Sequence, residues 1–282
     1  MTEQATSGWR RFWNRGGGWK ALLLAAVYYA LYQLMSIFLV GPLFSSVWGE
    51  QGSAEYVFFA VTLPIVLAGV LLVVFGLSIG WLRELFGPQP IRGREWMWIA
   101  VVAVLLFNVL RFAAIDYAEA GFAVVASWLL AGLAIGFAEE TLTRGYVVDL
   151  MRRAGHGEFA VALVSAGIFA ALHAGNLLTG QDLVPTLLQL VYTFCFGICM
   201  YLTLRVTGSL IWPILLHAST DPSIFLLTLH PSQSPLTPIA GLGNFAVIGT
   251  GLVLMWFIRG KVAPTEPDGL PESATRRDVP RS

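Results

Sequence analysis

Eight apolar stretches, each long enough to cross a bilayer, constrain this chain more than any other feature. A helix needs about 20 residues to span about 30 Å of hydrocarbon. The stretches cover residues 20–41, 57–80, 96–116, 122–150, 159–175, 184–204, 209–228 and 243–258. Because they are continuous and do not alternate in ten-residue segments, they predict helices and not a barrel. We therefore expect an all-α, polytopic membrane bundle of about eight transmembrane helices.

The charge content argues against a soluble protein. Of 282 residues, 17 are basic and 17 acidic, so 12% are charged, about half the fraction of a soluble domain. The net charge is zero, so the chain also lacks the excess of basic residues that is typical of a nucleic-acid binder. We expect membrane lipids around the chain and no nucleic-acid partner.

Basic residues alternate between successive loops, which predicts an orientation. The loops after spans one, three, five and seven contain no Lys or Arg. The other loops and the two terminal segments hold Arg10, Arg11, Arg15, Lys20, Arg83, Arg92, Arg94, Arg152, Arg153, Arg205, Arg259 and Lys261. The positive-inside rule then places both termini in the cytoplasm.

The domain boundaries and location follow from this orientation. We predict a cytoplasmic N-terminal segment at 1–19 and a membrane domain at 20–260, with a catalytic half at about 122–228. The polar, proline-rich segment 261–282 is predicted to be a disordered cytoplasmic tail. The whole is expected to be a multi-pass protein of a plasma (inner) membrane.

Several ionisable side chains lie inside the predicted spans, where they usually face the bundle interior or a water-filled cavity. Arg111 is near the outer end of its span, so we expect it to extend toward water or toward Asp116. The remaining groups lie deeper, and they are Glu139, Glu140, Arg144, His173, His217 and Asp221.

The fourth span presents two adjacent carboxylates in different directions. Glu140 and Arg144 are four residues apart, share a helix face and can form an ion pair. Thr143 lies on the same side and could donate a hydrogen bond to a carboxylate. Glu139 is rotated by about 100° from its neighbour, so this pair leaves it without a partner. An unpaired carboxylate in a low-dielectric environment indicates a functional role.

Two further spans place histidines at a similar depth. Phe169 and His173 share one helix face, and His217 and Asp221 share another. A lone histidine could simply hydrogen-bond to a neighbouring helix, and Asp221 could cap the helix before Pro222. At a rise of 1.5 Å per residue, however, these groups and Glu140 all lie about 14–22 Å above the cytoplasmic face. We therefore predict one shared polar site.

The order and spacing of these residues resemble the CAAX protease and bacteriocin-processing family, which includes the type II CAAX prenyl endopeptidases. The resemblance covers about residues 130–225. Its three motifs are Glu139-Glu140-x-x-x-Arg144, Phe169-x-x-x-His173 and His217-x-x-x-Asp221.

The resemblance implies an eight-helix, metal-independent intramembrane glutamate endopeptidase with no cofactor. Glu139 and His173 would then activate the attacking water, and His217 and Asp221 would stabilise the oxyanion. The same motifs also contain Glu140, Thr143, Arg144 and Phe169, which would support the site.

Two positions depart from the family pattern. Asp221 stands where the family frequently has Asn, and an ionised Asp accepts but cannot donate a hydrogen bond. It could instead orient His217. Thr143 stands where an aromatic residue is frequent, so the shape of the pocket can differ.

Water activation suits the chemistry of these groups independently of the family. Amide hydrolysis needs a base for the water and hydrogen-bond donors for the developing oxyanion, and Glu and His side chains supply both. The substrate would be a peptide or a protein, with or without a lipid modification, and nothing in the sequence indicates a prenyl site.

Three other functions use the same residues. Two His and one Glu could hold a catalytic zinc. The pocket could belong to a non-proteolytic binding or immunity protein. A proton-coupled transporter would also contain buried carboxylates, but matched repeats of broken helices are not recognisable in this sequence.

Overall fold

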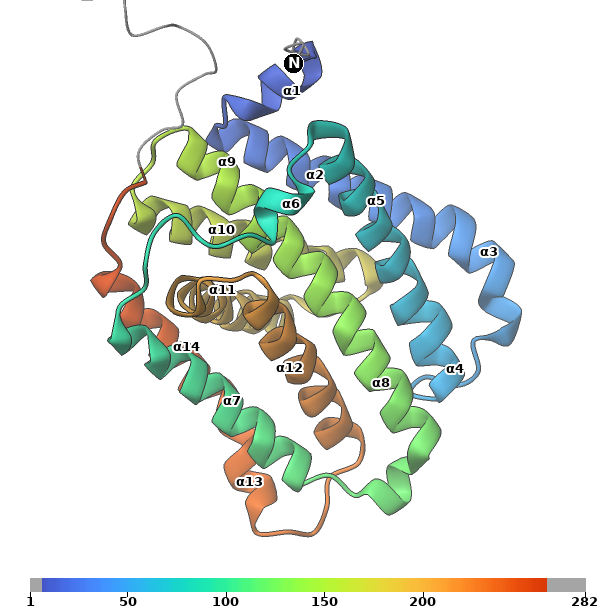
Figure 1. Cartoon of the computed structure of the whole chain (residues 1–282). Coiled ribbons are helices and arrows are strands. Elements are labelled where there is room, and N and C mark those ends of the chain that lie inside the picture. Colours follow the sequence, from blue (N-terminus) through green and yellow to red (C-terminus); the bar gives the residue numbers. More distant parts are fainter. Residues whose placement is uncertain (1–6, 263–282) are drawn as a thin grey trace, which may run out of the picture.

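The structure is a computed structural model that describes residues 7–262, and the described part is a helical bundle (Figure 1). Its α-helices are α1 Gly8–Asn14, α2 Gly18–Met35, α3 Gly41–Phe44, α4 Ala54–Tyr56, α5 Leu63–Ile79, α6 Leu82–Leu85, α7 Trp98–Ala113, α8 Tyr117–Glu140, α9 Val148–Arg153, α10 Glu158–His173, α11 Leu183–Thr207, α12 Ile211–Leu229, α13 Leu236–Gly241 and α14 Gly243–Leu254. Wider π-helical turns cover Ser36–Val40, Val57–Thr62 and Thr141–Val147, and 3₁₀ turns cover Ser45–Val47, Glu95–Met97, Ala174–Thr179 and Met255–Phe257. Between residues 7 and 262 there is no strand, only isolated bridges.

The predicted all-α membrane bundle is confirmed, with one difference in the count of spans. Seven helical segments are long and apolar enough to cross a membrane: Gly18–Val47, Ala54–Ile79, Glu95–Ala113, Tyr117–Arg153, Glu158–Leu178, Leu183–Thr207 and Leu236–Phe257. The predicted span 209–228 is also a helix, α12, but its polar residues, including His217 and Asp221, lower its hydropathy below that of the others. The chain is an integral, multi-pass membrane protein.

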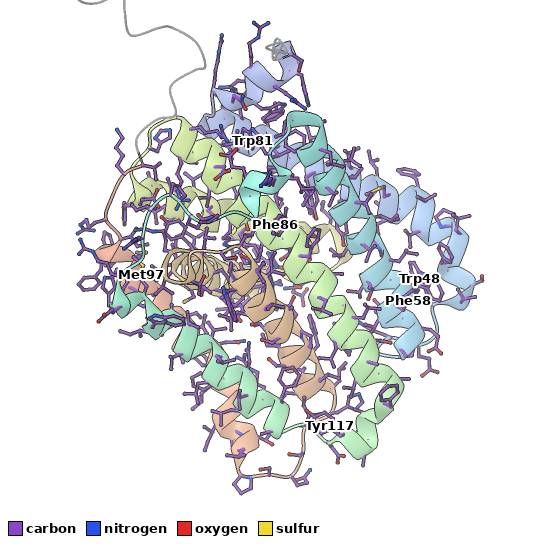
Figure 2. All side chains as sticks on the ribbon, in the orientation of Figure 1. Trp48, Phe58, Trp81, Phe86, Met97 and Tyr117 are labelled. Carbon is purple, nitrogen blue, oxygen red and sulfur yellow. The ribbon has the colours of Figure 1, made fainter. Side chains whose placement is uncertain are left out.

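Helices α8 and α12 lie side by side in the centre of the bundle (Figure 1). Helix α7 packs along the other side of α12, α5 packs against α8, and α11 packs against α10 and α14. Large apolar side chains point outward on many helices, as expected for lipid contact (Figure 2). Trp81 marks the end of the bundle that carries the N-terminus, and Tyr117 marks the opposite end (Figure 2).

A pair of glycines brings the backbones of α8 and α12 into close contact. A Cβ at Gly132 would lie 2.3 Å from the Ala218 carbonyl oxygen, and one at Gly136 would lie 2.6 Å from the Ile214 carbonyl oxygen. Only glycine fits at these two positions, so Gly132-x-x-x-Gly136 is a small-residue motif that permits close helix packing. Pro222 lies inside α12 without ending it, and its ring contacts the Gly132 position.

A buried carboxylate links helices α9, α10 and α11 at the end of the bundle where α1 lies. Glu158 of α10 accepts hydrogen bonds from Arg152 Nε at 2.9 Å, Arg152 NH2 at 2.7 Å and Arg205 NH1 at 3.0 Å. The Tyr201 hydroxyl also donates to it. Arg152 and Arg205, which the sequence assigned to loops, are buried at helix ends, where both guanidinium groups donate to this carboxylate.

Some predictions lie beyond these observations. The predicted tail 261–282 lies outside the described residues except for Lys261 and Val262, and residues 1–6 of the predicted N-terminal segment also lie outside them. The cytoplasmic placement of both termini stays a prediction.

Cysteine labelling tests that placement. Gln51 and Arg83 are exposed in loops that the positive-inside rule assigns to opposite sides of the membrane, and the native Cys195 and Cys199 are buried and give little background. We expect a membrane-impermeant maleimide to label Gln51→Cys in intact cells and Arg83→Cys only after permeabilisation. The reverse pattern would show that the termini face the other side.

Candidate active site

The two adjacent glutamates at the end of α8 enter different environments, as the 100° rotation predicts. The Glu140 side chain is 0% exposed and points toward Arg144 and His217. The Glu139 side chain is 17% exposed and lines two cavities. Its buried Oε2 atom has no hydrogen-bond partner among the described residues. One helix end thus supplies an enclosed carboxylate and a cavity-facing one.

Glu140 forms the predicted ion pair. Arg144 NH1 lies 3.1 Å from Glu140 Oε1 and also donates to the Thr143 hydroxyl at 2.5 Å. The guanidinium stacks over the Phe169 ring, with 4.6 Å between its carbon and the ring centroid. Thr143 does not donate to a carboxylate as expected. It donates to the Glu139 carbonyl oxygen at 2.6 Å, which is the common bond of a helical threonine to the carbonyl four residues earlier.

The same Glu140 oxygen also binds His217 of α12. His217 Nδ1 lies 2.7 Å from Glu140 Oε1, and because an ion-paired carboxylate only accepts, Nδ1 carries a hydrogen. His217 Nε2 faces the cavity-side acids, at 3.7 Å from both Glu139 Oε2 and Asp221 Oδ2. The rings of Phe169 and Phe196 pack edge-on against the imidazole. The ring of His217 is therefore fixed in orientation between three carboxylates.

His173 completes the set from the end of α10. Its Nδ1 lies 3.0 Å from the Phe169 carbonyl oxygen, and since a carbonyl only accepts, Nδ1 donates and Nε2 remains available for proton transfer. His173 and Glu139 line the same two cavities. Phe169 contacts His173, His217 and Arg144, so it holds together the groups that the sequence predicted to meet.

The two cavities differ in size and character. The smaller, of about 150 Å³, includes Tyr28, Tyr29, Tyr32 and Gln33 of α2 in its wall. The larger, of about 1070 Å³, has a mostly apolar wall and also contains Asp221. It extends to Gln51, Thr228 and Gly241, at the end of the bundle away from the N-terminus. A space of this size can hold water and a segment of peptide beside the carboxylate.

The prediction for Arg111 is wrong. Its side chain is 3% exposed and does not reach Asp116, which instead accepts from the first backbone N–H groups of α8. Arg111 donates to Asn108 Oδ1 at 3.3 Å and to Asn244 Oδ1 at 2.9 Å. These amide partners keep the guanidinium inside the bundle. From the sequence, Asn108 could have been expected as a partner of Arg111 because it lies three residues earlier on the same helix. Nothing in the sequence indicated Asn244 as the second partner.

The structure also adds residues that the motifs did not indicate. Phe196 packs on His217, and the tyrosines of α2 line the smaller cavity. Their types are common in apolar spans, so only the tertiary arrangement identifies them. Within residues 7–262, no group of three or more His, Cys, Asp or Glu side chains is arranged to hold a metal ion.

The ion pair of Arg144 predicts a large stability effect. Arg144→Met leaves the buried Glu140 carboxylate without its cation, so we expect a loss of about 3–5 kcal/mol in the free energy of unfolding. Equilibrium unfolding in mixed micelles measures it. The control Arg83→Met changes an exposed arginine and should alter stability by no more than about 0.5 kcal/mol. Equal stability of the two variants would contradict the pairing.

The comparisons with known proteins agree with the motifs. Residues 121–222 match the family model described as Type II CAAX prenyl endopeptidase Rce1-like, which confirms the resemblance over the segment that contains Glu139, Glu140, His173, His217 and Asp221. No curated protein and no solved structure matches the chain.

Proposed function

We propose that this protein is a metal-independent intramembrane endopeptidase that hydrolyses peptide bonds with water activated by Glu139 and His173. One observation carries the proposal: both side chains line one large cavity inside a membrane bundle together with Asp221, and His217 Nε2 lies 3.7 Å from both Glu139 and Asp221. The family match supports protease chemistry. The membrane of residence would be a plasma (inner) membrane.

The cavity-lining carboxylate of Glu139 suits a general base. A water held by this carboxylate and by Nε2 of His173 loses a proton to these groups as its oxygen attacks the carbonyl carbon. The tetrahedral intermediate then collapses, the C–N bond breaks, and the proton passes to the nitrogen of the leaving amine. The enclosed bundle keeps bulk water away from the site, which strengthens the electrostatic interactions of Glu139 and His173 with the reacting atoms.

His217 is placed to stabilise the oxyanion. With Nδ1 bound to Glu140, its Nε2 is the nitrogen that can donate to the developing negative charge when the ring carries both hydrogens. Glu140 and Asp221 supply the counter-charge. At 3.7 Å from Nε2, Asp221 acts through its charge on His217, which accounts for an acid where the family frequently has Asn.

The apolar cavity fits a substrate that carries a large apolar group. Trp128, Ile135, Phe225 and Phe245 contribute to its wall. A prenylated C-terminal segment, the CAAX class named in the family description, is the first substrate to test. Peptides that lack the lipid are the alternative.

Removal of the base tests the peptidase. A fluorescent S-prenylated peptide in detergent or nanodiscs serves as substrate, with products identified by mass spectrometry. We expect Glu139→Gln and His173→Ala to lower kcat by about 100-fold or more, while Glu95→Gln and His156→Ala, exposed residues outside the site, retain activity.

Three outcomes would favour the alternatives. Equal residual activity in wild type and both site variants would point to a non-proteolytic binding or immunity protein. Stoichiometric zinc in the purified protein, lost together with activity on chelation, would assign the same histidines to a metal site. Proton-coupled uptake into proteoliposomes would point to a transporter.

Asp221 gives a separate prediction. Asp221→Asn removes the charge beside His217 and keeps the shape, so we expect kcat to fall about tenfold with little change in KM. Steady-state kinetics of the variant measure both constants. A rise in kcat would show instead that position 221 donates directly to the oxyanion.

A further inference from the structure

Arg111 is a buried cation that the proposed mechanism does not use. Among the described residues, no Asp or Glu lies within ion-pair distance of its guanidinium. Within residues 7–262, it donates hydrogen bonds to the amide oxygens of Asn108 and Asn244. Burying a charge without a counter-charge is costly, so this position calls for a ligand that supplies one.

Residues of three helices surround the Arg111 guanidinium. Asn108 Nδ2 donates to Ser219 Oγ at 2.9 Å and to Thr220 Oγ1 at 2.8 Å on α12, which turns Asn108 Oδ1 toward Arg111. On α14, a Cβ at Gly243 would lie 2.3 Å from Arg111 NH2, so only glycine leaves room. The cation is thus held by α7, α12 and α14 together.

The position adjoins the large cavity. Asn244, which holds Arg111 NH2, lines that cavity together with Tyr192 and Asp221. The Tyr192 hydroxyl is buried and has no hydrogen-bond partner among the described residues. The guanidinium therefore lies directly behind Asn244, in the wall of the cavity that Tyr192 and Glu139 also line.

We propose that Arg111, Asn244 and Tyr192 form a subsite for a carboxylate of the peptide substrate. The inference rests on the proposed peptidase function and extends it. A carboxylate supplies the missing counter-charge, and the planar guanidinium is suited to bind it with two hydrogen bonds. The carboxylate can come from the C-terminus of the peptide or from an acidic side chain, and its anchoring determines which bond reaches Glu139.

Binding to an inactive variant tests the subsite without cleavage. In Glu139→Gln, we compare three fluorescent S-prenylated peptides of otherwise neutral sequence: a free acid, a C-terminal amide, and an amide with one Glu near its end. We expect the free acid to bind about 10- to 100-fold more tightly than the plain amide. Tight binding of the Glu-containing amide would assign the side chain as a source of the carboxylate.

The double variant Glu139→Gln/Arg111→Met should bind all three peptides equally, and Glu139→Gln/Arg83→Met should keep the preference. Because Arg111 has no acidic partner, its replacement should not lower Tm, which is measured in parallel. Unchanged preference in the Arg111 variant, or equal binding of acid and amide to Glu139→Gln, would overturn the subsite.

Cleavage by the active enzyme separates this inference from the proposed function. If the wild type cleaves the peptides but Arg111→Met leaves the acid-to-amide ratio of kcat/KM unchanged, the peptidase stands and the subsite is wrong. If no peptide is cleaved yet Arg111 still governs binding of the carboxylate, the subsite stands and the peptidase is wrong.

Discussion

A single buried carboxylate, Glu140, holds the centre of this protein together. Its Oε1 atom binds Arg144 within the same segment and His217 on a neighbouring helix. The contact with His217 depends on the close approach of α8 and α12, which Gly132 and Gly136 allow. Without a counter-charge the Glu140 carboxylate could not be buried. Without this carboxylate, the ring of His217 would lose its fixed orientation. The proposed site therefore follows from one ion pair and one glycine-lined contact.

Around that centre, adjacent residues perform different tasks because the helix turns them in different directions. Glu140 is enclosed and paired, whereas Glu139 lines a cavity. The buried arginines Arg144 and Arg111 differ in the same way: Arg144 has a carboxylate as a partner, and Arg111 has only amides. The paired arginine supports the structure, and the amide-bound arginine is the one that can recruit a ligand.

Those features of the site that depend on helical periodicity and on depth in the membrane could be predicted from the sequence. The pairing of Glu140 with Arg144, the divergence of Glu139 and the meeting of α8 with α12 all follow from residue spacing. The burial of Arg111 does not, because its partner Asn244 lies 133 residues away and only helix packing brings them together. The partner of Thr143 was also missed, because a helical threonine hydroxyl can bond the backbone carbonyl four residues earlier in place of a side chain.

In the proposed mechanism, water held by Glu139 and His173 attacks the peptide bond directly. A single turnover in H₂¹⁸O with enzyme in excess tests this step. We expect one ¹⁸O atom in the new carboxyl group of the product and none in the protein. Label found in the Glu139 side chain, with unlabelled product, would contradict it, because the carboxylate would then have attacked the substrate itself.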